Sequence, residues 1–303
     1  MAIYKRLLFI INPSAGVQKK EGPLAEIIGT FSDHDYETIV CFTRTAGDAS
    51  RLVKEHTGDG IDRIVCMGGD GTLNEVVSGC VEIGWDKPIG YIPAGSTNDF
   101  AASLGIPADA VKAAKRVMDG KPLALDVGVF NDRSFVYTAS SGLFTKTSYE
   151  TPQVIKNRLG HFAYVLEGAK DMSSLFKPNK MEICARTGQK EEVFRGEYIL
   201  ASVCNTFSLG GVMTFDSEVV SLQDGMFEIL LIEQPKDMVS LNGIIRALNE
   251  QDYSLSDQVH FCKAAEAVIK CPDAPDWSLD GEHGIGKKVN EFHVIPRAVS
   301  ILC

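Results

Sequence analysis

The feature that most constrains the fold is the alternation of short apolar runs with helical patterns along the first part of the chain. The apolar runs cover residues 6–11, 37–42, 63–67 and 88–92, and segments of helical pattern such as residues 47–56 separate them. This alternation is typical of βαβ units, in which helices cover the faces of a parallel sheet. The sequence therefore predicts an α/β domain at the N-terminus.

After residue 121 the pattern changes to successive strands. The strand-like runs here are residues 123–130, 134–139, 180–186, 198–205 and 226–233. Two helical patterns interrupt them, at about residues 152–175 and 237–249. Successive strands with few helices favour an antiparallel sheet or sandwich. We predict a mostly-β, sandwich-like second domain of residues 126–293, and a first domain of residues 1–125 completed by residues 294–303.

The composition argues against several classes of protein. The 303 residues include 30 Lys and Arg against 40 Asp and Glu, and this net charge of −10 is unlike that of proteins that bind nucleic acid through a broad basic face. The apolar runs are far shorter than the about 20 residues that span a bilayer. The eight cysteines lack CxxC spacing and the six histidines lack metal-ligand spacing, so neither a disulfide framework nor a zinc site is indicated. We expect a cytoplasmic protein.

The clearest candidate site is the sequence Gly68-Gly-Asp-Gly-Thr72, which follows one strand-like run and precedes an apolar helical pattern. Glycines at a strand-to-helix turn let backbone N–H groups approach a phosphate, and the helix adds its positive N-terminal end. Glycines also make ordinary tight turns, but three of them around an Asp and a Thr exceed what a turn requires. The loop is predicted to bind a polyphosphate.

Two further loops follow neighbouring strands, at residues 12–16 and 93–100. Because ligands of open α/β sheets bind at the carboxyl ends of the strands, all three loops are expected to face one crevice. In the second loop Thr97 can donate to a phosphate, and Asp99 can orient a partner or hold the water of a metal ion. Residues 12–16 are weaker evidence by themselves, since Asn-Pro is an ordinary turn pair.

A pair of carboxylates stands far along the chain, in Asp280-Gly281-Glu282. Phosphoryl transfer to an alcohol needs one carboxylate that accepts the hydroxyl proton and another that orients the hydroxyl or the metal. Asp-Gly is also the strongest short-range turn signal, so residue chemistry alone gives a solvated hairpin turn equal weight.

Taken in order and spacing, Gly69-Asp-Gly-Thr-Leu-Asn-Glu75, Gly95-Ser-Thr-Asn-Asp99 and Asp280-Gly-Glu282 resemble the diacylglycerol kinase catalytic domain family. The match is closest to the soluble bacterial lipid kinases of the diacylglycerol kinase B and YegS-like group, and it covers essentially the whole chain. The resemblance implies an α/β nucleotide-binding domain of the NAD kinase and diacylglycerol kinase type, followed by a β-sandwich domain for the lipid.

The resemblance also implies roles for individual residues. Asp70, Asp99 and Asp126 correspond to the acidic set that organises Mg²⁺ and its waters, and Glu282 to the proton acceptor, with Asp280 beside it. The residues implied to contact ATP are Asn12, Pro13, Ser14, Ala15, Gly16, Thr43, Gly69, Asp70, Gly71, Thr72, Leu73, Asn74, Glu75, Thr97, Asp99 and Asp126.

A separate structural Mg²⁺ site is implied in the second domain. Its ligands are the side chains of Ser221 and Asp224 and the carbonyl of Met226, and oxygen ligands are what Mg²⁺ prefers. The chain departs from the family here, because Glu218 and Val220 stand where a Pro and an Ala are common. A hairpin turn is the plainer interpretation of Asp224-Gly225.

The function that the resemblance implies is an ATP- and Mg²⁺-dependent lipid kinase, which transfers the γ-phosphate of ATP to a lipid hydroxyl, with diacylglycerol giving phosphatidic acid. Two alternatives stay open: an NAD kinase-like enzyme with a soluble substrate, and a nucleotide-binding regulator without catalysis. No nucleic-acid partner is expected, and the sequence leaves a homodimer open.

A lipid acceptor requires contact with a membrane surface. Residues 146–180 carry six basic groups against three acidic ones, although the chain as a whole is acidic. Each basic residue near an anionic leaflet contributes about 1 kcal/mol, enough for weak and reversible docking. We expect transient peripheral contact through the helical pattern at residues 155–169, whose apolar stripe is equally consistent with ordinary core packing. The basic residues are Lys146, Lys156, Arg158, Lys170, Lys177 and Lys180.

Overall fold

The computed structural model describes residues 4–16, 23–95, 98–143, 178–206, 208–209, 213–214 and 220–303. The chain forms two compact units, Met1–Leu125 with Arg297–Cys303, and Asp126–Pro296. The sequence pattern placed the second division at residue 293, whereas the units divide after Pro296. This division falls inside the strand β17 (Val289–Leu302), where the periodicity of the sequence does not change.

The first unit contains a parallel sheet with the strand order β17-β4-β3-β1-β2. In β1 the residues from Leu7 to Ile11 are all buried, because both faces of the sheet are covered by helices. The strands besides β17 are β1 (Lys5–Ile11), β2 (Tyr36–Phe42), β3 (Arg63–Gly68) and β4 (Ile89–Pro93).

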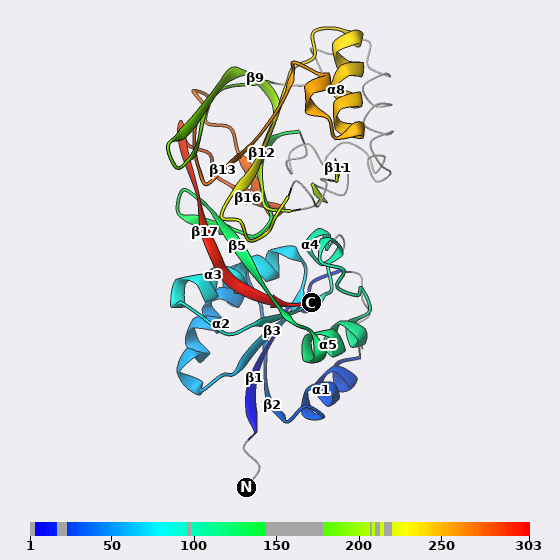
Figure 1. Cartoon of the computed structure of the whole chain (residues 1–303). Coiled ribbons are helices and arrows are strands. Elements are labelled where there is room, and N and C mark those ends of the chain that lie inside the picture. Colours follow the sequence, from blue (N-terminus) through cyan, green and yellow to red (C-terminus); the bar gives the residue numbers. More distant parts are fainter. Residues whose placement is uncertain are drawn as a thin grey trace. The chain divides into compact units, whose positions relative to one another are not determined.

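Helices pack in pairs on the two sides of this sheet. Helix α1 packs with α5, and α2 packs with α3 on the other side (Figure 1). The predicted α/β architecture of this part of the chain is confirmed. The helices are α1 (Leu24–Ser32), α2 (Asp48–His56), α3 (Asp70–Ile83), α4 (Asp99–Ser103) and α5 (Ala110–Asp119), with a 3-10 turn at Thr57–Asp59 after α2.

The second unit is mostly β, as predicted, and its strand pairs are antiparallel. The main path runs β16-β15-β7-β9-β8-β14-β17. The long strand β9 pairs with β8 along its first half and with β7 and β12 along its second half. The strands besides β17 are β5 (Pro122–Phe130), β6 (Arg133–Phe135), β7 (Thr138–Gly142), β8 (Asn179–Thr187), β9 (Lys190–Cys204), β10 (Ser208–Leu209), β11 (Met213–Thr214), β12 (Phe227–Glu233), β13 (Val259–Ala264), β14 (Glu266–Lys270), β15 (Trp277–Leu279) and β16 (Glu282–Gly284).

The core of the second unit is built around aromatic side chains that alternate inward along the strands. Phe130, Trp277 and Phe292 meet with ring centroids 5.1–5.4 Å apart, and Phe135 stacks on Phe227 at 5.6 Å. All five are at most 2% exposed. The burial of these aromatic side chains stabilises the strands and the hairpin turns between them, including the turn at residues 280–282.

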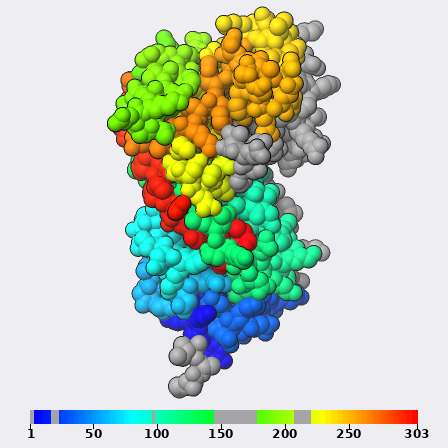
Figure 2. Space-filling view, in the orientation of Figure 1, coloured from blue at the N-terminus to red at the C-terminus, as the bar shows by residue number. Residues whose placement is uncertain are grey.

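The helix predicted at residues 237–249 is α8 (Met238–Glu250), which lies on the surface of the second unit, in yellow and orange in Figure 2. Asp237 caps its first turn by accepting the backbone N–H of Ser240, whose hydroxyl accepts the N–H of Asp237 in return. A 3-10 turn at Tyr253–Leu255 follows α8. The helix predicted at residues 152–175 lies outside the described residues. Among the helices that the structure describes, none is long and apolar enough to cross a membrane.

Candidate active-site residues

Three loops come together at the carboxyl ends of β1, β3 and β4 in the first unit. The side-chain amide of Asn12, after β1, donates to the Thr72 hydroxyl in the first turn of α3 at 3.0 Å, and the Asn12 N–H donates to Met67 O at 2.9 Å. The N–H of Asp99, at the start of α4, donates to Asp70 Oδ2 at 3.2 Å. Three loops that are far apart in sequence therefore form one continuous rim.

Glycines make this rim narrow and bare. A Cβ built on Gly95 would lie 2.6 Å from the Cα of Gly69, and one on Gly16 would overlap the carbonyl oxygen of Ala94. Gly16 also has a φ of 72°, in the left-handed region that side chains rarely adopt. No residue with a side chain fits at these contacts, so a ligand at the rim meets backbone.

The rim carries two carboxylates. Asp70 opens α3, where a negative charge is favoured by the helix dipole, and its Oδ1 accepts from the Tyr91 hydroxyl at 3.5 Å. Burial raises the pKa of the Asp99 carboxyl, since the ionised form is poorly solvated there. Asn98, with a φ of 54°, holds the turn before Asp99 through two hydrogen bonds to Gly95, at 2.8 and 2.9 Å. A cation at the rim would relieve the desolvated charge of Asp99.

Other predicted ligands of ATP have structural contacts of their own. Glu75 accepts the N–H groups of Gly47 at 2.7 Å and Ala49 at 3.0 Å, so its carboxylate caps the start of α2. The Leu73 side chain is 1% exposed and belongs to the core. Thr43 is buried beside the end of β1, where its N–H donates to Ile11 O at 2.9 Å.

The remaining predicted positions on the rim are placed as follows. Pro13 and Ser14 are exposed, and Ser14 N–H donates to Asn12 Oδ1 at 3.0 Å, a local turn that presents residues 13–16 to solvent. Asn74 accepts from the Ser78 hydroxyl one helical turn on, at 3.5 Å. Thr97 lies outside the described residues. The others at the rim are Ala15 and Gly71.

The two carboxylates of the 280–282 turn have different environments. Asp280 is 3% exposed and accepts three backbone N–H groups, from Val136 at 2.6 Å, Tyr137 at 3.0 Å and Thr138 at 2.9 Å. Its φ of 48° is left-handed, a strained value that the three hydrogen bonds help to maintain. Glu282, at the start of β16, is exposed. Asp280 thus holds the hairpin that presents Glu282.

Asp126 is also a buried junction. Its Oδ2 accepts the N–H of Gly225 at 2.6 Å, its own N–H donates to Leu222 O at 2.8 Å, and its carbonyl accepts from the Asn205 side chain at 2.8 Å. The carboxylate is 1% exposed. Within the second unit, Asp126 therefore fixes the 221–226 turn onto the first residues of the unit.

Asp224, where the resemblance implies a structural Mg²⁺ site, contacts other groups of the protein. Asp224 Oδ1 accepts the N–H of Met226 at 3.1 Å, and Oδ2 accepts the Lys263 ammonium at 2.9 Å. Lys263 also lies 3.4 Å from Glu228 Oε1. In the part of the chain that the structure describes, no group of three or more His, Cys, Asp or Glu could hold a metal ion. The Lys263 ammonium is thus a cation that meets Asp224, and the structural Mg²⁺ site at Ser221, Asp224 and Met226 stays a prediction.

Glu228 and Lys263 are polar residues of this corner that the sequence reasoning missed. Glu228 is fully buried, and desolvation raises its pKa to about 8 despite the opposing effect of Lys263. A signal was present, because Glu228 stands directly after Phe227 in a strand that is otherwise apolar up to Glu233. A carboxylate inside such a run needs a partner, but only the pairing of Glu228 with Lys263 across β12 and β13 identifies it.

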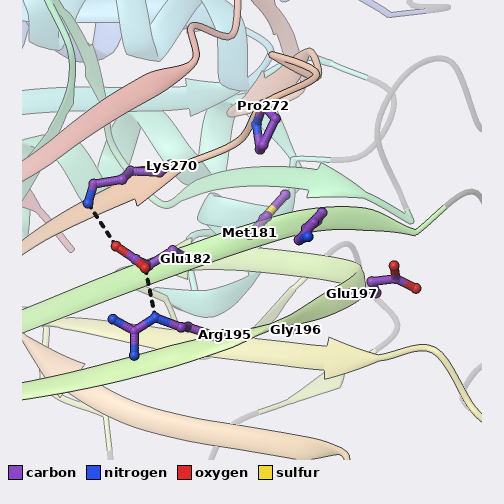
Figure 3. A pocket seen from close by; sticks show the side chains of 8 residues that line it. Met181, Glu182, Arg195, Gly196, Glu197, Lys270 and Pro272 are labelled. Atoms are coloured by element: carbon purple, nitrogen blue, oxygen red, sulfur yellow. Dashed lines mark hydrogen bonds and ion pairs between the residues drawn. The ribbon is translucent and has the colours of Figure 1, made fainter.

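A pocket on the second unit lies apart from every predicted site residue of that unit (Figure 3). Glu182 of β8 is its centre, and accepts from Arg195 of β9 and Lys270 of β14, both at 2.7 Å. These hydrogen bonds lower the pKa of Glu182 to about 2. Three of the charges that line the pocket, those of Glu182, Arg195 and Lys270, therefore pair with one another. Its lining residues are Lys180, Met181, Glu182, Arg195, Gly196, Glu197, Lys270 and Pro272.

Comparison with known proteins identifies relatives over almost the whole chain. Residues 6–130 match the family model of the diacylglycerol kinase catalytic domain. The diacylglycerol kinase of Bacillus subtilis strain 168 is 34% identical over 300 residues, covering 98% of this chain and 96% of the relative. That of Staphylococcus saprophyticus is 30% identical over 288 residues, covering 95% and 92%.

A solved structure shares the fold. The crystal structure of a diacylglycerol kinase from Bacillus anthracis superposes with a TM-score of 0.76, at 21% identity, over 100% of this chain and 98% of the other. At 21% identity the likeness shows the fold alone. The family is assigned from the two relatives above. The chain belongs to the diacylglycerol kinase family of lipid kinases.

Proposed function

We propose that this chain transfers the γ-phosphoryl group of ATP to the free hydroxyl of diacylglycerol and so forms phosphatidic acid. The observation that carries the proposal is the bare glycine rim where Gly16, Gly69 and Gly95 meet at the start of α3. Such a rim lets backbone N–H groups and a helix N-terminus approach the phosphates of a nucleotide. The first unit is then the nucleotide-binding domain, and the second is the lipid-binding domain.

The rim also fits a divalent cation beside the nucleotide. Asp70 and Asp99 would supply carboxylate oxygens of the kind that Mg²⁺ prefers, and the N–H of Asp99 donates to Asp70 Oδ2, which brings the two residues together. Burial raises the pKa of the Asp99 carboxyl, which supports a cation beside it. When bound, Mg²⁺ neutralises charge on the phosphates and on the transferred group. The Asn12 amide and the backbone of residues 69–72 orient the nucleotide, while the close contact of Gly95 with Gly69 keeps side chains out of the rim.

Glu282 is the residue that accepts the proton of the lipid hydroxyl in this proposal. Its side chain is exposed, whereas the oxygens of Asp280 already accept three backbone N–H groups. Asp280 acts as a positioning residue, because it fixes the turn from which Glu282 projects. Catalysis then consists of positioning the two substrates, neutralising charge and removing one proton.

The test is phosphoryl transfer from γ-labelled ATP by the purified full chain with Mg²⁺. Diacylglycerol in mixed micelles and NAD⁺ are offered separately. Labelled phosphatidic acid is the expected product, and Glu282→Gln should abolish it while ATP still binds in a titration. Transfer to NAD⁺ alone would favour the NAD kinase alternative. ATP binding without transfer to either acceptor would favour a regulator.

The acceptor lipid implies that a cytoplasmic protein meets the membrane surface transiently. The basic stretch proposed for this contact, residues 146–180, lies outside the described residues up to residue 177. Co-sedimentation with anionic vesicles tests it: reversing Lys156 and Arg158 to Glu should weaken binding. Reversing Lys112 and Lys115, which are exposed on α5, is the matched control and should have less effect. Equal binding by both variants counts against this segment.

A further inference from the structure

A cysteine, a histidine and an aspartate form a chain of hydrogen bonds at the edge of the first unit. Cys41 Sγ lies 3.5 Å from His56 Nε2, and His56 Nδ1 lies 2.6 Å from Asp59 Oδ2. Cys41 is in β2, the edge strand of the sheet, His56 ends α2, and Asp59 is in the 3-10 turn that follows. The proposed kinase reaction uses none of these three side chains.

The direction of the hydrogen bonds follows from the partners. Asp59 is a carboxylate and can only accept, so His56 donates from Nδ1 and keeps the lone pair of Nε2 toward the thiol. A nucleophile within reach of a base, with that base oriented by a third group, is the arrangement that activates Ser and Cys in enzymes. Here it is built from one strand and one helix end.

We propose that Cys41 is a reactive thiol that His56 deprotonates, and that its reaction partners are small electrophiles, with peroxides as the oxidising class. With a hydroperoxide, the Cys41 sulfur attacks the terminal oxygen: an S–O bond forms and the O–O bond breaks. The thiol is oxidised to a sulfenic acid and the hydroperoxide is reduced to the alcohol. The thiol proton passes through His56 Nε2 to the leaving alkoxide, so no further reductant or proton donor is needed.

The surroundings of Cys41 make the histidine necessary. Burial raises the pKa of the Cys41 thiol, Glu55 raises it further, and Arg51 opposes this. The resting thiol is therefore protonated, and an unassisted Cys41 would react slowly. Proton transfer to His56 creates an imidazolium beside Asp59, which compensates its charge. Arg51 is held by Asp48 at 3.0 Å and by Glu55 at 2.7 Å, so it does not compete for Asp59.

The other cysteines provide internal controls. Cys66, Cys80, Cys204, Cys262 and Cys271 are buried, whereas Cys184 and Cys303 are partly accessible like Cys41. Among the described residues, Cys41 is the cysteine with an imidazole within hydrogen-bond distance. Accessibility alone predicts that Cys184, on the outer face of β8, reacts at least as fast as Cys41. Activation by His56 predicts the opposite order.

The experiment is time-resolved alkylation of the folded full chain with iodoacetamide, followed by mass spectrometry of the cysteine peptides. Cys41 should be the fastest site, and His56→Gln should slow Cys41 about tenfold or more while Cys184 keeps its rate, since base assistance is worth about 10²- to 10⁴-fold. Asp59→Asn should slow Cys41 less. His34→Gln is the matched control, because His34 pairs with Asp119 at 3.5 Å without a cysteine, and it should change nothing.

A second readout follows oxidation directly. After a brief exposure to hydrogen peroxide, trapping with dimedone should mark Cys41 in the wild type and leave it unmarked in His56→Gln. Thermal unfolding of each variant checks that the fold is intact, and Asp59→Asn serves if His56→Gln does not fold. The proposal is overturned if Cys184 is labelled faster than Cys41, or if folded His56 and Asp59 variants label Cys41 at the wild-type rate.

Discussion

The candidate loops of the first unit and the acidic turns of the second are stabilised in different ways. Around Gly16, Gly69 and Gly95 the backbone itself forms the contact, and no side chain fits between the loops. In the second unit, the buried carboxylates of Asp126 and Asp280 accept backbone N–H groups that are distant in sequence. A site made of backbone depends on the absence of side chains, whereas a site held by carboxylates depends on every donor staying in place.

The largest effects are expected where one turn contains both a positioning and a reacting carboxylate. Asp280→Asn should lower the free energy of unfolding by about 3 kcal/mol, because an amide cannot accept the three N–H groups that the carboxylate accepts. Glu282→Gln, on an exposed side chain, should leave stability unchanged and reduce kcat about 10²- to 10⁴-fold. Urea unfolding and steady-state kinetics on both variants measure the two effects. The reverse pattern would exchange the two roles.

The next effect tests the backbone rim. Gly95→Ala places a Cβ 2.6 Å from the Cα of Gly69, and such overpacking costs about 1–3 kcal/mol. Because the displaced backbone is the proposed phosphate-binding surface, KM for ATP should rise while KM for the lipid does not. Gly29→Ala, in α1, is the matched control, since a Cβ there meets nothing within 4 Å. An unchanged KM for ATP in a folded Gly95→Ala protein would remove the rim from the site.

Much of the fold follows from the sequence because strands and turns have local patterns. The apolar runs at residues 6–11 and 63–67 are β1 and β3, and the glycines after β3 lie where the pattern places a phosphate loop. The contacts that decide roles are not local. Glu75 looks like part of the loop motif, yet it caps α2, and this depends on how α2 packs beside α3.

The corner at Asp224 shows the same limit in the second unit. The family resemblance implies a metal ion here, whereas the Asp-Gly pair alone favours a hairpin turn. Neither indicates that the strand register sets Glu228 of β12 opposite Lys263 of β13, whose ammonium meets Asp224 as well. No local pattern around Asp224 indicates a lysine 39 residues away. Pairing across strands therefore decides which cation the carboxylate meets.

An internal cation at Asp224 has a measurable consequence. Lys263→Met should lower the free energy of unfolding by about 1.5 kcal/mol through loss of a charged hydrogen bond. Lys270→Met removes a lysine from an exposed pair with Glu182 and should lower the free energy of unfolding less, because solvent screens that pair. If Lys263 is the only cation at Asp224, the unfolding midpoint should be the same in millimolar Mg²⁺ as in a chelator. This should hold for the wild type and for Asp224→Asn. A rise in the midpoint with Mg²⁺ that Asp224→Asn abolishes would support the predicted metal site.

The smallest effects concern two surface carboxylates with different donors. Asp48 in the first unit accepts the backbone N–H groups of Arg44 and Thr45, which, with Arg51, lower its pKa to about 2. Glu182 in the second reaches about 2 through Lys270 and Arg195. Both folded pKa values lie below the unfolded ones, 3.8 and 4.5, so the folded state binds fewer protons. The contribution of each carboxylate to stability is therefore complete above its unfolded pKa and is lost as pH falls toward 2.

Salt should separate these two contributions. The donors of Glu182 are exposed side-chain cations, whose attraction is screened at high ionic strength, whereas the backbone donors of Asp48 keep their geometry. Acid titrations of unfolding between pH 5 and 2 should therefore show the Glu182→Gln difference shrinking in about 1 M salt, with the Asp48→Asn difference largely retained. If both differences shrink alike, the side chain of Arg51 rather than the backbone stabilises the Asp48 carboxylate. The contrast between contacts made by backbone and contacts made by side chains would then not apply to surface carboxylates.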